Sequence, residues 1–202
     1  INKINIKPKI RKNWEIKIGG DQMKLIIVRH GQTNFNLERK LQGVTDNELN
    51  DNGKNQAEQT KEKLENETFD LILCSPLIRA RQTADIINKE RKVKIIYDER
   101  LIERDFGEFE GKYIKEYNVD EFWSYLQNKK YQKAENIREF LDRVYSFLDE
   151  IKEKYKNKNI LIVAHAGISV AVECYFNGIP KDDKLVEIRL KNCEYRKYEM
   201  KD

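Results

Sequence analysis

Short apolar runs recur along the chain and predict buried strands. The run that starts at Leu25 reads LIIVRHG, and similar runs cover Phe69 to Ser75 and Asn159 to His165. None of them shows the alternation of a half-buried strand, so each is typical of a parallel strand that helices cover on both faces. A shorter and partly polar run from Val93 to Tyr97 predicts a fourth strand.

Segments with helical spacing of apolar residues separate these runs. Three such patterns predict helices over about 52–65, 79–90 and 135–155. The last is strongly amphipathic, because apolar residues return every three or four positions while charged residues occupy the other face. A fourth segment, 167–176, is apolar nearly all round, which predicts a well-buried helix that ends at Gly178.

The remaining segments complete the predicted fold. Residues 185–190 and 193–198 alternate like two strands, and 106–133 has weak periodicity typical of a small cap of loops and short helices. Alternation of strands and helices predicts a three-layer α/β/α fold with a mostly parallel sheet. We find no repeat or linker that would divide 23–202 into two domains.

Charge is distributed unevenly along the sequence. The chain has 202 residues and a net charge of +4, but residues 1–22 alone carry six basic and two acidic side chains. The rest holds 33 of each sign, which argues against a nucleic-acid partner. We expect 1–22 to be an N-terminal extension outside the fold, with translation starting naturally at Met23.

The length of the apolar runs and the number of cysteines indicate where in the cell the protein is expected. No apolar run reaches the roughly 18 residues needed to span a membrane, and 1–22 lacks the apolar core of a signal peptide. We therefore expect a cytoplasmic protein without a membrane partner, either a monomer or a homodimer. Its cysteines, expected to be reduced packing thiols, are Cys74, Cys174 and Cys193.

The two histidines of the chain each end a predicted strand. His30 and His165 both precede a small residue, and the carboxyl ends of parallel strands share the edge where ligands bind. Taken alone, either histidine is more often a hydrogen-bonded structural residue than a catalytic one. Arg29 precedes His30, however, and Arg79 begins the helix after the second strand, so two guanidinium groups join them.

Two arginines with two histidines suit a phosphoryl group, because each guanidinium stays charged and grips oxygen atoms in pairs. The same arginines would repel a metal ion, so we expect neither metal nor cofactor. Arg29 and His30 can share a ligand only if regular strand ends near Arg29, since alternation would place them on opposite faces.

Four carboxylates follow the Val93 to Tyr97 run, and spacing alone does not choose among them. They are Glu103, Asp105, Glu108 and Glu110. All four would also be acceptable as solvated loop residues, so at this point the acid of the site is undecided.

Four motifs in order carry a family resemblance. They are RHGQT from Arg29 with Asn36, SPLxRAxQTA from Ser75, LxExxFGxxEG from Leu101, and VAHAG from Val163. Together they resemble the histidine phosphatase superfamily, whose members have a phosphoglycerate mutase-like fold, over almost all of 24–198. Some members have an arginine shortly after the last motif, where this chain has ISVA from Ile168.

The resemblance implies a role for each matching residue. His30 would be the phosphorylated nucleophile and Glu103 the proton donor. Arg29, Arg79 and His165 would form the phosphate pocket. Further positions that match pocket-lining positions of the family are Asn36, Gln42 and Ala166.

The compact segment between Glu103 and His165 favours the phosphatase branch over the mutases, which carry longer insertions there. We therefore expect a metal-independent phosphomonoester hydrolase that acts on a small phosphorylated metabolite through a phosphohistidine intermediate. The alternatives are a 2,3-bisphosphoglycerate-dependent phosphoglycerate mutase and a specialised alpha-ribazole phosphatase. Aromatic residues gather in 106–133, and we expect most of them to pack the cap against the sheet.

Overall fold

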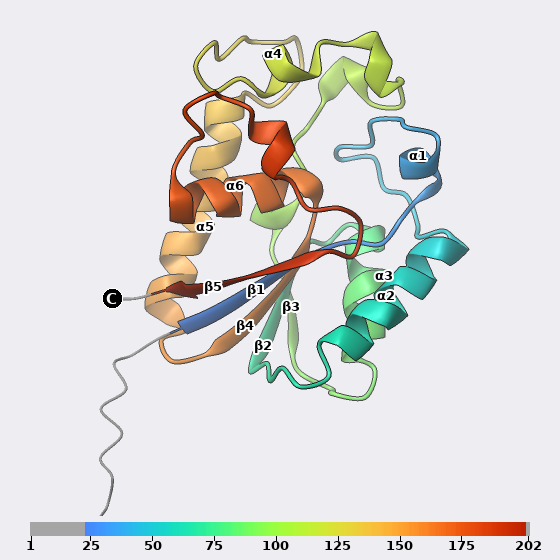
Figure 1. The fold of residues 1–202 in the computed structure, drawn as a ribbon, viewed down its shortest axis with the longest axis vertical. Helices are drawn as coiled ribbons and strands as arrows, with labels where there is room; N and C mark the ends of the chain where they lie inside the picture. The colour runs from blue at the N-terminus through green and yellow to red at the C-terminus, as the bar shows by residue number, and fades with distance from the viewer. Residues whose placement is uncertain (1–22, 201–202) are drawn as a thin grey trace, which may run out of the picture.

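The computed structural model describes residues 23–200, and the predictions made for 1–22 lie outside this range. Its centre is a five-stranded sheet with the order β3-β2-β4-β1-β5 (Figure 1). The strands are β1 (Met23–Arg29), β2 (Leu71–Cys74), β3 (Ile95–Tyr97), β4 (Asn159–Ala164) and β5 (Tyr195–Met200). The first four are parallel and β5 runs antiparallel to β1, which confirms the mostly parallel sheet.

Helices cover both faces of the sheet. They are α1 (Asn34–Leu37), α2 (Asp51–Lys63), α3 (Ile78–Asn88), α4 (Val119–Trp123), α5 (Ile137–Lys154) and α6 (Ala166–Asn177). In Figure 1, α2 and α3 lie on one side of the sheet and α5 and α6 on the other. The predicted three-layer α/β/α arrangement is confirmed, as are the four predicted helices.

The side chains of β1 explain why its sequence is apolar without alternation. Leu25 and Ile27 pack in one hydrophobic cluster with α5 and α6, whereas Ile26 and Val28 pack in a second cluster with α3. All four are 5% exposed or less. Each such burial contributes about 1.5–3 kcal/mol, so the two faces of the sheet stabilise the fold together.

One predicted strand is wrong. Residues 185–190 contain the short 3-10 helix η4 (Leu185–Ile188), not a strand. The alternating residues Val186, Ile188 and Leu190 all pack against the core, but they do so from a tight turn, in which the Glu187 N–H donates to the Lys184 carbonyl at 3.1 Å. The segment has no place in the sheet, because β4 and β5 already occupy both edges of β1.

The cap predicted over 106–133 is confirmed as a group of short elements. Besides α4 it contains the 3-10 helices η2 (Gly107–Phe109) and η3 (Ile114–Glu116), and it follows η1 (Glu99–Leu101). In Figure 1 it lies at the top, beyond the end of the sheet where β1 and β4 finish. Phe122 is its packing centre, 1% exposed and in ring contact with Phe109, Tyr117 and Tyr131.

The cysteines and the helices were also compared with the expectations from the sequence. The three cysteines are free and buried, as predicted for packing thiols. Among the helices of 23–200, none combines the length and apolar character that crossing a lipid bilayer requires.

Candidate active site

Neighbouring parallel strands bring the two histidines together. β1 and β4 pair with Arg29 opposite Ala164, so His30 and His165 follow at the same sheet edge. Their ring centroids are 5.1 Å apart and the rings meet edge to face. Figure 1 shows that this edge lies beneath the cap.

Hydrogen bonds define which nitrogen of His30 carries the proton. Its Nδ1 lies 2.7 Å from the carbonyl oxygen of Gly31, which only accepts, so Nδ1 is the protonated nitrogen. The Arg79 Nε group donates to Nε2 of His30 at 3.3 Å. Burial, then the charges of Arg79 and Arg29, lower the pKa of His30 well below its ordinary value. His30 is therefore a neutral imidazole with its lone pair on Nε2.

His165 is fully buried behind His30, and it does not itself line the cavity. Its Nε2 lies 2.7 Å from the Ser75 hydroxyl, which in turn accepts the Leu77 N–H at 3.4 Å. Burial and the charge of Arg79 lower the pKa of His165 as well. The other ring nitrogen of His165, Nδ1, has no partner among the described residues.

Two arginines, the half-buried Arg29 and the buried Arg79, lie beside the histidines without a carboxylate partner among the described residues. Arg29 donates to the Leu190 carbonyl at 2.8 Å, and its Nε is unpartnered. Arg79 donates to the carbonyls of Gly43 and Thr45 at 2.7 and 2.8 Å. Burial lowers the pKa of both guanidinium groups to about 10, so both stay charged at neutral pH. Their charge is left for an anion to balance.

The strand break predicted near Arg29 is present. β1 ends at Arg29, and both Arg29 and His30 line the same cavity. The residue after His30 is Gly31, and it lies against Gly53: a Cβ on Gly31 would lie 2.4 Å from the carbonyl oxygen of Gly53. The close contact between 31 and 53 therefore requires a residue without a side chain.

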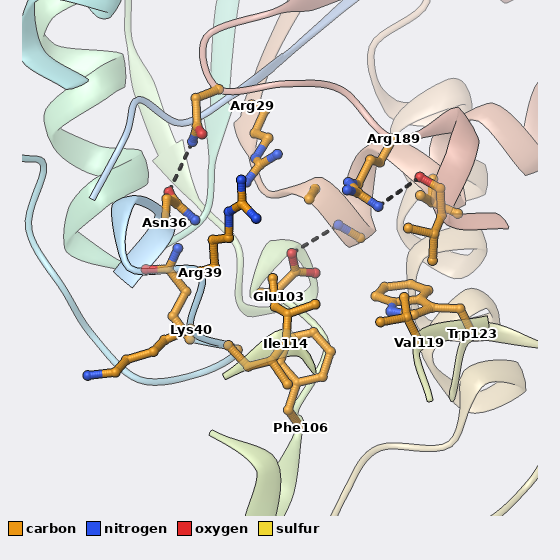
Figure 2. Close-up of a pocket in the computed structure, with 18 of the residues that line it drawn as sticks. Arg29, Asn36, Arg39, Lys40, Glu103, Phe106, Ile114, Val119, Trp123 and Arg189 are labelled. Carbon is orange, nitrogen blue, oxygen red and sulfur yellow. Dashed lines mark hydrogen bonds between the residues drawn. The ribbon is translucent and has the colours of Figure 1, made fainter. Parts of the chain in front are cut away.

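Of the four candidate carboxylates, Glu103 alone lines the cavity. Its two oxygens accept the N–H groups of Arg104 and Gly167, both at 2.9 Å. Figure 2 shows Glu103 in the cavity. Burial raises the pKa of Glu103 and outweighs these bonds and the nearby arginines, which lower it. A carboxyl with a raised pKa holds a proton more readily, as a general acid must.

The other acids have structural positions. Asp105 accepts the Gly107 N–H at 2.7 Å, and Glu108 is exposed. Glu110 accepts the N–H groups of Val44 and Thr45, both at 2.8 Å. Thr45 is thereby held between Glu110 and Arg79, a contact that sequence spacing could not indicate.

The remaining predicted residues also line the cavity. Asn36 accepts the Asn192 side-chain amide at 3.1 Å, and Gln42 accepts the Thr33 hydroxyl at 3.0 Å. Their own amide N–H groups have no partner in the described part of the chain. Ala166 is the first residue of α6, where backbone N–H groups favour an anion.

Several cavity residues were not singled out from the sequence. The cavity measures about 360 Å³ and also includes Arg39, Lys40, Ile114, Val119 and Arg189 (Figure 2). Most of them come from the cap and from the loops after α1 and η4, whose positions depend on long-range packing. Of the aromatic residues of the cap, Phe106, Tyr117 and Trp123 reach the cavity, while Phe109 and Phe122 pack inside the cap.

A sheet edge that gathers two neutral histidines, two arginines and one carboxyl with a raised pKa suits the transfer of a phosphoryl group. The chain belongs to the histidine phosphatase superfamily, since the family model of branch 1 matches residues 25–202. It is a phosphatase of this superfamily, with the expected phosphoglycerate mutase-like fold.

Individual relatives agree with this assignment. The phosphatase PhoE of Bacillus subtilis is 37% identical over 181 residues, which cover 87% of this chain and 91% of the relative. The structure of Bacillus stearothermophilus YhfR is 30% identical with a TM-score of 0.73, covering 81% of this chain and 83% of that one. The alpha-ribazole phosphatase of Shigella flexneri is 26% identical with a TM-score of 0.75, covering 87% and 89%.

Proposed function

We propose that the protein is a metal-independent phosphomonoester hydrolase that works through a phosphohistidine at His30. The observation that carries the proposal is the state of three groups in one site. The lone pair of His30 is on Nε2, Arg29 and Arg79 have no carboxylate partner within 23–200, and Glu103 has a raised pKa. A phosphoryl dianion would supply the missing negative charge.

In the first step the Nε2 atom of His30 attacks phosphorus and the bond to the ester oxygen breaks. Glu103 donates its proton to that oxygen, so the product leaves as a neutral alcohol. Arg29 and Arg79, which line the cavity, hold the phosphoryl oxygens while charge spreads over them, and His165 supports them from behind His30. Removing one such preorganised donor typically costs about 10²–10³ in kcat.

In the second step water replaces the histidine. The Glu103 carboxylate takes a proton from water, the water oxygen attacks phosphorus, and the phosphorus–nitrogen bond breaks. Its electron pair returns to Nε2, and inorganic phosphate leaves. The bond from Nδ1–H of His30 to the Gly31 carbonyl stabilises the positive charge that the ring carries while it is phosphorylated.

The substrate class we propose is a small phosphorylated metabolite, because the cavity of about 360 Å³ is near the lower end of ligand pockets. Phosphoglycerate mutase activity is the alternative reaction. Alpha-ribazole phosphate is a candidate substrate as well, because the chain is similar to an alpha-ribazole phosphatase of Shigella flexneri. We also propose a cytoplasmic location and a monomeric or homodimeric state.

The deciding experiment is a release assay for inorganic phosphate over a panel of phosphorylated metabolites with EDTA present. A 2,3-bisphosphoglycerate-dependent mutase assay is run on the same preparation. We expect hydrolysis of several panel members to exceed mutase turnover and to resist EDTA. Mutase turnover faster than any hydrolysis would reverse the choice of reaction.

A further inference from the structure

Asn192 lines the cavity, although it lies outside the four motifs of the sequence. It belongs to the turn between η4 and β5, 162 residues after His30. Its side-chain Nδ2 donates to two oxygens, the carbonyl of His30 and Oδ1 of Asn36, each at 3.1 Å. One amide group therefore contacts both the backbone of the proposed nucleophile and a polar side chain of the cavity wall.

Backbone groups fix the orientation of the two side-chain amides. The His30 carbonyl only accepts hydrogen bonds, so the Asn192 atom that lies beside it is the nitrogen. The Thr33 N–H only donates, so the Asn36 atom that lies 3.2 Å from it is the oxygen. Each amide is thus held in one of its two possible orientations.

The orientation of Asn36 leaves its NH₂ group for the cavity. Its Oδ1 accepts from Thr33 and from Asn192, whereas its Nδ2 has no hydrogen-bond partner within 23–200. Figure 2 shows the hydrogen bond that reaches the Asn36 oxygen. Because Arg29 and His30 line the same cavity, the free NH₂ group is a neutral donor beside the charged donors of the phosphoryl pocket.

Two bonds to one oxygen make the other orientation of Asn36 costly. Rotating the amide by half a turn would bring its NH₂ group against two donors, the Thr33 N–H and the Asn192 amide. Asn36 is half-buried in the four-residue helix α1, and its bond from Thr33 is at the long end of the usual range. The bond from Asn192 therefore supplies much of the restraint on this side chain.

The backbone of the turn is held without the Asn192 side chain. The Cys193 N–H donates to the Arg29 carbonyl at 3.0 Å. The Thr60 hydroxyl on α2 donates to the Cys193 carbonyl at 2.8 Å. A substitution that shortens the Asn192 side chain should therefore leave the turn and Arg29 in place.

We propose that Asn192 is a positioning residue for phosphoryl transfer, which holds the Asn36 amide so that Nδ2 donates to a phosphoryl oxygen. Asn192 acts through Asn36 and does not itself bind the phosphoryl group. A donor that is already oriented needs no reorganisation when charge develops on the phosphoryl oxygens. The proposal rests on the proposed function in one respect: it takes the phosphoryl group to lie beside His30.

A double-mutant cycle tests whether Asn192 acts through Asn36. The kcat/KM for phenyl phosphate is measured in wild type, Asn36→Ala, Asn192→Ala and the double variant. We expect a loss of about 10²-fold in Asn36→Ala, which removes the donor, and of about tenfold in Asn192→Ala. The double variant should lie within about threefold of Asn36→Ala, because a positioning residue has no effect once the amide it positions is absent.

Binding of inorganic phosphate gives a readout without turnover. Calorimetry measures its affinity, and heteronuclear NMR follows the side-chain amide signals of Asn36, which are assigned by their loss in Asn36→Ala. We expect phosphate to shift these signals in wild type. In Asn192→Ala the shift should be smaller, and phosphate should bind about threefold or more weakly.

Asn177→Ala is the matched control, because it removes an exposed amide that donates to Glu173 and does not line the cavity. It should keep the wild-type kcat/KM and the wild-type shift of the Asn36 signals. Thermal unfolding checks that every variant is folded. Asn192→Ser serves if the alanine variant does not fold, because one hydroxyl proton cannot be donated to both the His30 and the Asn36 oxygen.

Three results would overturn the positioning role. The first is the same loss from Asn192→Ala in the wild-type and Asn36→Ala backgrounds, which would show that the two residues act independently. The second is an unchanged kcat/KM in a folded Asn192→Ala, and the third is an equal loss in Asn177→Ala.

The same measurements separate this proposal from the hydrolase itself. Hydrolysis of phenyl phosphate with independent effects of Asn36 and Asn192 overturns the positioning role and leaves the hydrolase standing. Losses of phosphate affinity that are coupled between the two residues, with no ester of the panel hydrolysed, support the positioning role and overturn the hydrolase.

Discussion

The hydroxyl of Ser75 lies 2.7 Å from Nε2 of His165, and Nδ1 of that ring has no partner among the described residues. Ser75 follows β2 and His165 follows β4, so sheet pairing places both at one edge. The same hydroxyl accepts the Leu77 N–H at 3.4 Å, which holds it beside the ring. When the hydroxyl donates to Nε2, neutral His165 keeps its proton on Nδ1.

Ser75→Ala should therefore reduce kcat more than it weakens substrate binding. Without the hydroxyl, neutral His165 can place its proton on either nitrogen, and one buried ring atom loses its partner. We expect kcat for phenyl phosphate to fall about 10- to 100-fold. Thermal unfolding checks that the variant stays folded. A folded Ser75→Ala with wild-type kcat would show that Ser75 does not position His165.

Replacement of His30 tests the covalent intermediate. His30→Ala removes the Nε2 lone pair, so both turnover and the acid-labile phosphoenzyme should disappear together. Rapid quenching with a radiolabelled ester measures the phosphoenzyme directly, and folding is followed by circular dichroism. Phosphate release by His30→Ala at the wild-type rate would refute attack by this residue.

Glu103→Gln tests the proton donor. The amide keeps the size of the carboxyl but has no acidic proton, so esters of poor leaving groups should suffer most. We expect a loss of about 10²–10⁴ for an alkyl phosphate and a clearly smaller loss of phosphoenzyme formation with p-nitrophenyl phosphate. Equal losses with both esters, measured by the burst of released alcohol, would argue against an acid role.

The two buried histidines should make stability depend on pH. Both have pKa values well below 6.5 in the folded protein, while in the unfolded chain they titrate near 6.5. Below about pH 6.5 the unfolded chain thus binds more protons, and the free energy of unfolding falls as pH falls. Each histidine contributes a slope of up to about 1.4 kcal/mol per pH unit.

Urea unfolding between pH 5 and 7 measures this slope. The pKa of Glu103 is raised by folding, so at pH values above its pKa in the unfolded chain Glu103 makes the free energy of unfolding fall as pH rises. The slope of the wild type is therefore the sum of the histidine and Glu103 contributions. The difference in slope between wild type and His30→Gln gives the contribution of His30, because the variant removes that imidazole and keeps Glu103. The slope should be smaller in the variant, and an identical slope would show that His30 is not kept neutral by the fold.

The sequence predicts the sheet well because burial on both faces leaves a strong local signal. The LIIVRHG run is the strand β1 followed by the turn that contains His30, and the predicted break at Arg29 is where β1 ends. Residues 185–190 mislead for the same local reason. Their alternating residues Val186, Ile188 and Leu190 pack against the core from a 3-10 turn, and local periodicity does not distinguish that from a strand.

The sequence predicts the site residues that lie in the four motifs, but not those that lie outside them. Glu103 and Glu110 stand seven residues apart in one acidic loop, and spacing does not say which meets the substrate. The fold places Glu103 and not Glu110 at the cavity, because α6 offers the Gly167 N–H to Glu103 while the loop after α1 offers two N–H groups to Glu110. Arg39 and Arg189 carry no comparable signal, since each reaches the cavity through long-range packing.

Glu110 joins the start of the cap to the loop that also holds Arg79. Both residues bind the short segment 43–45, the acid through its N–H groups and the arginine through its carbonyls. A change of cap shape around Glu110 would therefore reach Arg79 through this peptide segment. Grafting a foreign cap onto this sheet would alter the reaction rate along with the choice of substrate, unless the graft brings its own 43–45 segment with it.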